Sequence, residues 1–109
     1  MTVRNHRFRG KRYAIQTTVR VIGQCIRPSE TYDGEIYIDP RQRPRQTLDT
    51  VVHESLHALF PHETEHSIDQ AAHDLSSLLW RMGYRPVYRK RKMPSPKRLV
   101  SQRKVWRDT

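Results

Sequence analysis

The chain has 109 residues, a formal net charge of +10 at pH 7 and 35% hydrophobic residues. A chain of this size is expected to form one small domain with a modest core, in which a bound metal often adds stability. It has no apolar run of about 18 residues and no signal-peptide pattern, so we expect no membrane partner and a cytoplasmic location. The single cysteine, Cys25, excludes an internal disulfide and is expected to be a small buried residue.

Charge divides the chain into three parts. Residues 1–12 hold five Lys/Arg and no acid (+5), residues 85–109 hold ten against one acid (+9), and residues 13–84 hold six against ten (−4). Blocks of like charge usually belong to flexible interaction tails. We therefore predict one folded domain at residues 13–84, with a basic N-terminal arm before it and a basic C-terminal tail after it.

Two stretches near the start of the domain have the residue types of β-strands. Residues 13–27 are rich in β-branched side chains and partly alternate, and residues 35–39 follow a turn-like stretch at residues 28–34. We expect the two strands to pair as an antiparallel hairpin or meander. Residues 40–46 are predicted to be a basic loop that leads into a helix.

Two helices are predicted after the strands. The first begins at its N-cap, Thr47, and ends before Pro61. The second is capped by Thr64, runs to about Met82 and stops at Gly83. The expected fold class is α+β: a short β-hairpin or meander packed on a two-helix hairpin, with basic arms. Apolar stripes at three- and four-residue steps mark the expected core faces, namely Leu48, Val51, Val52, Ser55 and Leu59 in the first helix and Ile68, Ala71, Ala72, Leu75, Leu78, Leu79 and Met82 in the second.

The first helix carries the pattern H-E-x-x-H at residues 53–57. Four residues make about one helical turn, so His53 and His57 project from one face and can ligate one ion. Glu54 lies one position round the helix, where it could reach a water at an open coordination site and act as its base. The simpler alternative is a chance match on a polar helix face of a chain with six histidines. The helical context favours a zinc site.

Two histidines leave a catalytic zinc site incomplete, because such sites usually have three protein ligands and a water. If the helices form an antiparallel hairpin that turns at Pro61, positions equally far from the turn face each other. His57 lies four residues before Pro61 and Glu65 lies four residues after it, so Glu65 is the favoured third ligand. Asp69 and His62 stay open as alternatives, because a predicted helix boundary can shift by about two residues or more.

Residues 52–84 combine the sequence His-Glu-x-x-His-Ala-Leu-Phe-Pro, an acid at Glu65 and a helix that ends Leu-Leu-Trp-Arg-Met-Gly-Tyr. This stretch resembles small metallopeptidases of bacteriophage genomes, which are similar to the minimal gluzincin and SprT-like group of zinc proteases. The resemblance implies a short sheet before the zinc helix, His53 and His57 as ligands, and Glu54 as general base. SprT relatives use a later histidine as third ligand, whereas gluzincins use a glutamate on the next helix. Glu65 fits the gluzincin pattern with a short connection, which leaves a catalytic or a reduced, structural site open.

The enzyme hypothesis is hydrolysis of a peptide or protein substrate by a zinc-activated water, with Glu54 as base. The edge of the strand at residues 35–39 is expected to hold an extended peptide by strand addition. Tyr84 and Arg85 are candidate donors to the developing oxyanion. The SprT-like resemblance further suggests a peptidase that acts near nucleic acid and cleaves DNA-bound proteins.

The alternative is a non-catalytic protein with a structural zinc site. The Lys/Arg-rich arms would suit sequence-independent binding of nucleic acid, because no base-reading module is apparent. They could instead attach to an acidic protein surface, including a virion or host component, and a phage structural protein is a further possibility. Aromatic residues that could stack on bases are interleaved with the charges: Phe8, Tyr13, Tyr88 and Trp106.

Overall fold

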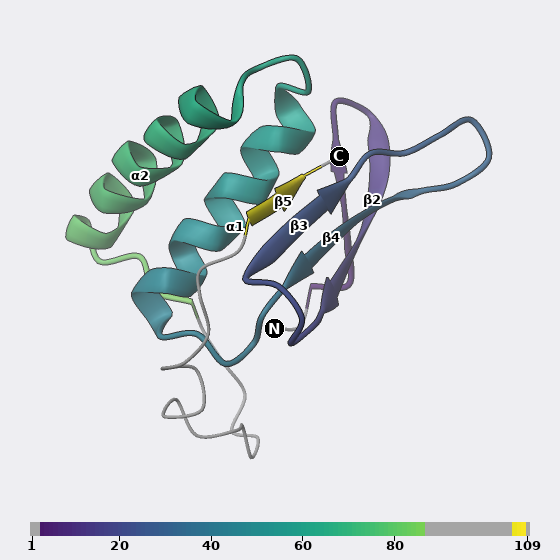
Figure 1. Cartoon of the computed structure of the whole chain (residues 1–109). Coiled ribbons are helices and arrows are strands. Elements are labelled where there is room, and N and C mark those ends of the chain that lie inside the picture. Colours follow the sequence, from purple (N-terminus) through teal and green to yellow (C-terminus); the bar gives the residue numbers. More distant parts are fainter. Residues whose placement is uncertain (1–2, 87–105, 109) are drawn as a thin grey trace.

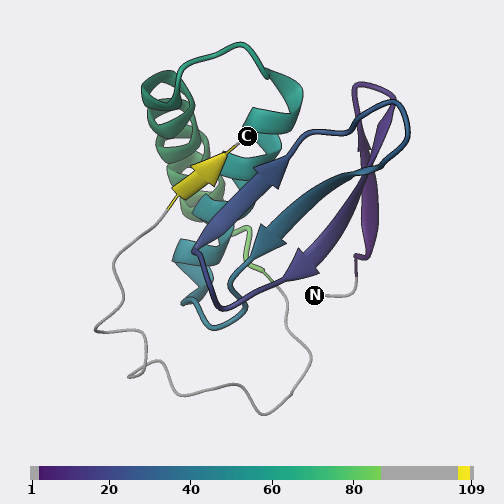
Figure 2. The same ribbon diagram turned by 45° about the vertical axis from the view of Figure 1, so that its right-hand side comes forward.

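The computed structural model describes residues 3–86 and 106–108 (Figure 1). These residues form an α+β fold, as predicted, in which α1 is packed between a mixed sheet and α2 (Figures 1 and 2). Residues 87–105 of the predicted C-terminal tail, including Tyr88, lie outside the described residues. The elements in chain order are β1 (Asn5–Phe8), β2 (Lys11–Thr17), β3 (Gly23–Ile26), β4 (Gly34–Ile38), α1 (Pro44–Leu59), α2 (Glu65–Arg81) and β5 (Trp106–Asp108).

The sheet has the strand order β1-β2-β4-β3-β5. β4 runs parallel to β2 and antiparallel to β3, whereas β5 runs parallel to β3 on its other side. The single strand predicted at residues 13–27 is wrong. The chain turns at residues 18–22 across the end of β4, where Thr18 N–H donates to Ile38 O and Asp39 N–H donates to Ile22 O. Because β4 then fills the space between β2 and β3, it has no outer edge, and the predicted peptide-binding edge at residues 35–39 is also wrong.

A tight hairpin joins β1 to β2 and places residues 5–12 of the expected N-terminal arm in the sheet. Arg9 and Gly10 at its turn both have positive φ, 52° and 77°. That conformation is the one that a two-residue hairpin turn needs to match the twist of its strands. The arginines and lysines of this hairpin are exposed, so its charge remains available on the surface.

α1 begins four residues earlier than the sequence predicts, at Pro44, with Arg43 rather than Thr47 as its N-cap. Proline suits the first helical position, because its fixed φ is helical and its missing N–H has no partner there anyway. Thr47 is therefore not the cap but a buried residue inside the helix. The sheet and α2 cover α1 from two sides, so its buried positions do not follow the single predicted stripe, whose residues are only partly buried. The buried positions are Thr47, Thr50, His53, Glu54, Leu56, His57 and Ala58.

α2 has the ends that the sequence predicts. Thr64 Oγ1 accepts a hydrogen bond from Ser67 N–H at 3.1 Å, and Gly83, with φ 95°, follows the last turn. Ile68 and Ala72 bury the first half of the helix against Leu56 of α1. The second half of the predicted stripe is wrong, because α2 turns Ser76 rather than its leucines towards α1. Its exposed fractions are 44% for Leu75, 52% for Leu78 and 63% for Met82.

Candidate metal centre

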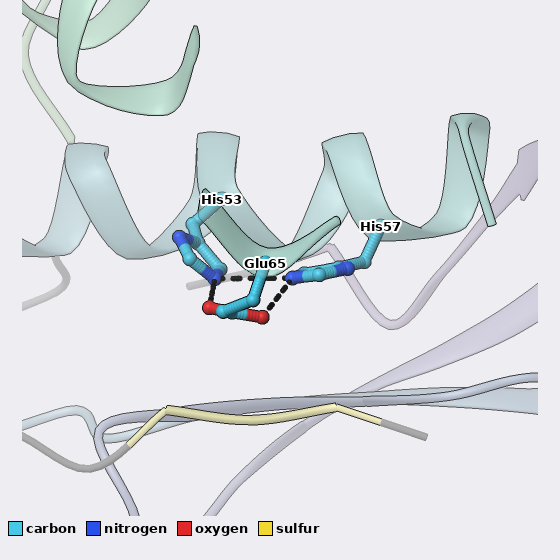
Figure 3. Close-up of side chains that lie close together, drawn as sticks. All are labelled: His53, His57 and Glu65. Carbon is cyan, nitrogen blue, oxygen red and sulfur yellow. Dashed lines mark hydrogen bonds and ion pairs between the residues drawn. The ribbon is translucent and has the colours of Figure 1, made fainter. Parts of the chain in front are cut away.

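His53 and His57 lie one turn apart on α1 and are almost completely buried, with exposed fractions of 0% and 5%. Their rings lie close together, and the two Nε2 atoms are 3.2 Å apart (Figure 3). Leu56 lies between them in sequence and packs against Ile68 and Ala72 of α2. The same helix packing that buries Leu56 therefore keeps the edge of both imidazoles beside the start of α2.

Glu65, the first residue of α2, reaches both histidines. Its Oε1 lies 3.0 Å from His53 Nε2, and its Oε2 lies 2.9 Å from His57 Nε2 (Figure 3). The chain turns between the end of α1 and the N-cap of α2, Thr64, so the first turn of α2 returns over the last turns of α1. The hairpin thus brings together the three residues that the sequence predicts as metal ligands.

These three contacts fit a cation better than hydrogen bonds alone. If both Nε2 atoms carry protons for Glu65, two N–H groups meet at 3.2 Å; if only one does, the other presents a lone pair to a carboxylate oxygen. Two ligands at zinc distances and a tetrahedral angle lie about 3.3–3.4 Å apart, close to the separations here. His53, His57 and Glu65 can therefore hold a metal ion.

The cluster is open on the side of the carboxylate. The histidine side chains are 0% and 7% exposed, whereas the Glu65 side chain is 52% exposed. A metal held here would be anchored in the protein by imidazole nitrogens and reached from solvent past the carboxylate. Structural zinc sites are usually closed by four protein ligands, whereas catalytic ones keep a position for water. Three protein donors with one exposed side leave room for a further ligand.

The two alternative third ligands take other positions. Asp69 Oδ1 lies 3.7 Å from Nδ1 of His53, the ring nitrogen opposite the cluster. A carboxylate beside the non-ligating nitrogen favours the tautomer with its proton there, which frees Nε2 for a metal. His62 is exposed in the connection between the helices and is not part of the cluster. The sequence identified Asp69 only as a possible ligand and gave no sign of this orienting position.

Glu54 is fully buried but faces the sheet rather than α2. A Cβ atom built on Gly23 of β3 would lie 2.7 Å from Glu54 Oε2 and 2.7 Å from Thr50 Cγ2. Glycine at residue 23 therefore gives the Glu54 side chain the space it occupies between α1 and β3. Gly23 was not predicted as a site residue. Its only signal in the sequence is a glycine within a β-branched stretch, which often marks a close approach.

Tyr84 and Arg85 are not near the cluster, and the prediction that they serve as oxyanion donors is wrong. They follow the C-terminal end of α2, about 24 Å along the helix from Glu65. Arg85 instead stacks on the ring of Trp80, with 3.5 Å between its guanidinium carbon and the ring centroid. Cys25 is buried in the core beside Tyr13 and Ile36, as expected.

Comparisons of the chain with protein families, with curated proteins and with solved structures found no match. Within the described residues, neither helix has the length and apolar character needed to cross a membrane. The interpretation of the site therefore depends on its own geometry and chemistry.

Proposed function

We propose that the protein is a zinc-dependent peptidase that hydrolyses peptide bonds. The observation that carries the proposal is the convergence of two buried imidazole nitrogens and a half-exposed carboxylate within 2.9–3.2 Å of one another. The buried acid of the H-E-x-x-H motif follows the first of these histidines directly. The resemblance of residues 52–84 to small phage metallopeptidases supports the same reading. Imidazole and carboxylate donors suit zinc, and their number leaves a fourth position for water.

Bound zinc would polarise a substrate carbonyl and make water a stronger nucleophile near neutral pH. The residues of the chain would do the rest. Asp69 would hold the ring of His53 with Nε2 towards the metal. Glu54 would accept the proton of the attacking water and pass it to the leaving amine. Its carboxylate comes from the same helical turn as the ligands but lies buried against Gly23 of β3, so it would have to turn towards the metal to act.

The test is metal analysis combined with peptidase assays of Glu54→Gln. The substitution keeps the size of the side chain and all three metal donors, so zinc content should equal that of the wild type. Removal of a general base should lower kcat by about 10²–10⁴-fold. Glu63→Gln is the matched control, because Glu63 is an exposed acid in the helix connection, outside the cluster. Equal activity of wild type and Glu54→Gln, or absence of zinc from protein purified without chelators, would refute the proposal.

A second candidate is a non-catalytic protein that binds nucleic acid and uses the metal to stabilise its fold. The observation that favours it is the β1–β2 hairpin with the residue before it, whose cations all lie on the surface: Arg4, Arg7, Arg9, Lys11 and Arg12. If these five cations neutralise about five phosphates, duplex DNA affinity should fall by about 500-fold between 50 and 200 mM salt, with little dependence on sequence. No DNA binding at 50 mM salt in a gel-shift assay would instead favour an acidic protein partner, such as a virion or host component, for these charges.

A further inference from the structure

β3 is the strand that links the candidate base to the outer part of the sheet. Gly23 lies under Glu54, and β5 covers the side of β3 that β4 leaves open. The backbone of Trp106 is in register with Gly23, so β5 passes one strand spacing, about 4.8 Å, from the residue on which Glu54 packs. Figure 3 shows β5 running past the metal cluster on the side where the Glu65 carboxylate lies.

The pairing shows which backbone groups β5 occupies. Asp39 N–H donates to Ile22 O, so Ile22 directs its polar backbone groups to β4. Because these groups alternate along a strand, Gln24 also faces β4, whereas Gly23 and Cys25 face β5. Arg107 is the register partner of Gln24. In a parallel ladder it is then Arg107 that bonds both flanking residues: its N–H is directed to Gly23 O, and its carbonyl accepts from Cys25 N–H.

We propose that the outer edge of β3 is a binding site for extended peptides, and that β5 of the same chain occupies this edge and blocks peptide binding until it is displaced. The inference rests on the proposed function, because the edge matters for catalysis only if peptides are the substrate. Strand addition draws its affinity from main-chain hydrogen bonds and therefore accepts many sequences. A segment of the same chain can compete in this way even though it is only three residues long.

The competition has an expected size. A tethered segment has an effective concentration of about 1 mM. If the segment itself binds the edge with a Kd of about 0.1 mM, it lowers the apparent affinity of a competing free peptide by roughly tenfold. Removing β5 from the edge should restore this factor. The same removal should expose the amides of Gly23 and Cys25 to solvent and leave the amide of Gln24 bonded to β4.

Two proline variants of the full chain test the proposal. Arg107→Pro removes the N–H that β5 directs to Gly23, whereas Asp108→Pro removes one that points away from β3, a position where an edge strand tolerates proline. Each is made in a Glu54→Gln background, so that binding is measured without turnover. The probe is a fluorescein-labelled peptide with the sequence of residues 103–109, followed by anisotropy. Amide exchange of residues 23–25 is followed by NMR.

Arg107→Pro should bind the peptide about tenfold more tightly than its parent and exchange the Cys25 amide at least tenfold faster. The exchange rate of the Gln24 amide should not change. Asp108→Pro should match the parent in peptide affinity and in amide exchange. Equal Cys25 exchange and equal peptide binding in parent and Arg107→Pro would overturn the proposal.

If Gln24 also loses protection, Arg107→Gly replaces the proline variant, since it keeps the amide and only weakens the strand. About threefold faster Cys25 exchange is then expected, and no change would overturn the proposal. Neither readout needs metal or cleavage, so failure of the peptidase proposal would appear separately, in zinc content and turnover.

Discussion

The two buried faces of α1 both carry polar side chains, but they differ in how those groups are matched. On the face towards the sheet, Thr50 Oγ1 donates to Gln42 Oε1 at 2.8 Å, and Gln42 Nε2 in turn donates to Asp39 O at 2.9 Å. Both of these donors therefore have an acceptor oxygen. On the face towards α2, the nitrogens of His53 and His57 converge with a carboxylate, and with Glu65 ionised no placement of protons on the two rings satisfies all the contacts.

This difference distinguishes a structural hydrogen-bond network on one face of α1 from a candidate metal site on the other face. Burial of polar groups is not by itself a sign of a site, because hydrogen-bonded polar groups are normal in protein interiors. The sheet face of α1 shows such a network, which attaches the start of the helix to the end of β4. The α2 face shows an arrangement of acceptors that a cation would complete. Glu54 lies between the two, buried on the sheet face but belonging to the motif of the other.

The largest expected effect on stability is removal of the metal. A ligand that binds only the folded state stabilises it by about 3–4 kcal/mol when its free concentration exceeds Kd by a few hundredfold to a thousandfold. For a domain of this size, chelation should therefore lower Tm by at least about 10 °C. Calorimetry with and without chelator measures the shift. In His57→Ala, chelator should not change the Tm. If chelator does not change the Tm of the wild type either, the polar groups on the α2 face interact with one another without a metal.

The helix pair could be predicted from the sequence because its signals are local. Pro61, the Thr64 cap and Gly83 mark the ends of the helices within one turn, and the position of Glu65 opposite His57 follows from them. The sheet could not, because its order depends on contacts between distant segments. Residues 18–22 contain no glycine or proline, so they do not themselves indicate that the chain turns there and leaves room for β4.

The position of Gly23 under Glu54 was beyond prediction for the same reason. Gly23 and Glu54 lie 31 residues apart in the sequence, and only the assembled sheet brings them together. The exposed Leu75, Leu78 and Met82 show the converse limit. Their helical spacing predicts burial, but in the described residues α2 has a single neighbouring helix, which covers only one side of it.

The next effect concerns Asp69, which would act on the α2 face without touching the metal. Loss of a carboxylate beside a ligating histidine lowers metal affinity by about 10–100-fold. Because the Asp69 side chain is 64% exposed, we expect Asp69→Asn to lie at the lower end, about tenfold. Competition with a chromophoric chelator measures the affinity. Asp74→Asn, at another exposed acid of α2, is the control and should leave the affinity unchanged; equal affinities for both variants would remove Asp69 from the site.

The last effect, and the one that best separates the two faces, is at Gly23. Gly23→Ala would place a methyl group 2.7 Å from Glu54 Oε2, so the carboxylate must move, at a cost of about 1–3 kcal/mol of stability. Gly34→Ala is the matched control, because its methyl would meet the ring of Tyr13 at 2.5 Å rather than a residue of the motif. Thermal unfolding should show both variants destabilised, and metal analysis should show both with full zinc. Only Gly23→Ala should also lower kcat beyond its loss of folded protein, since it alone displaces the candidate base. Equal specific activity of the two variants would mean that the position of Glu54 against β3 is structural and belongs with Thr50 rather than with the histidines.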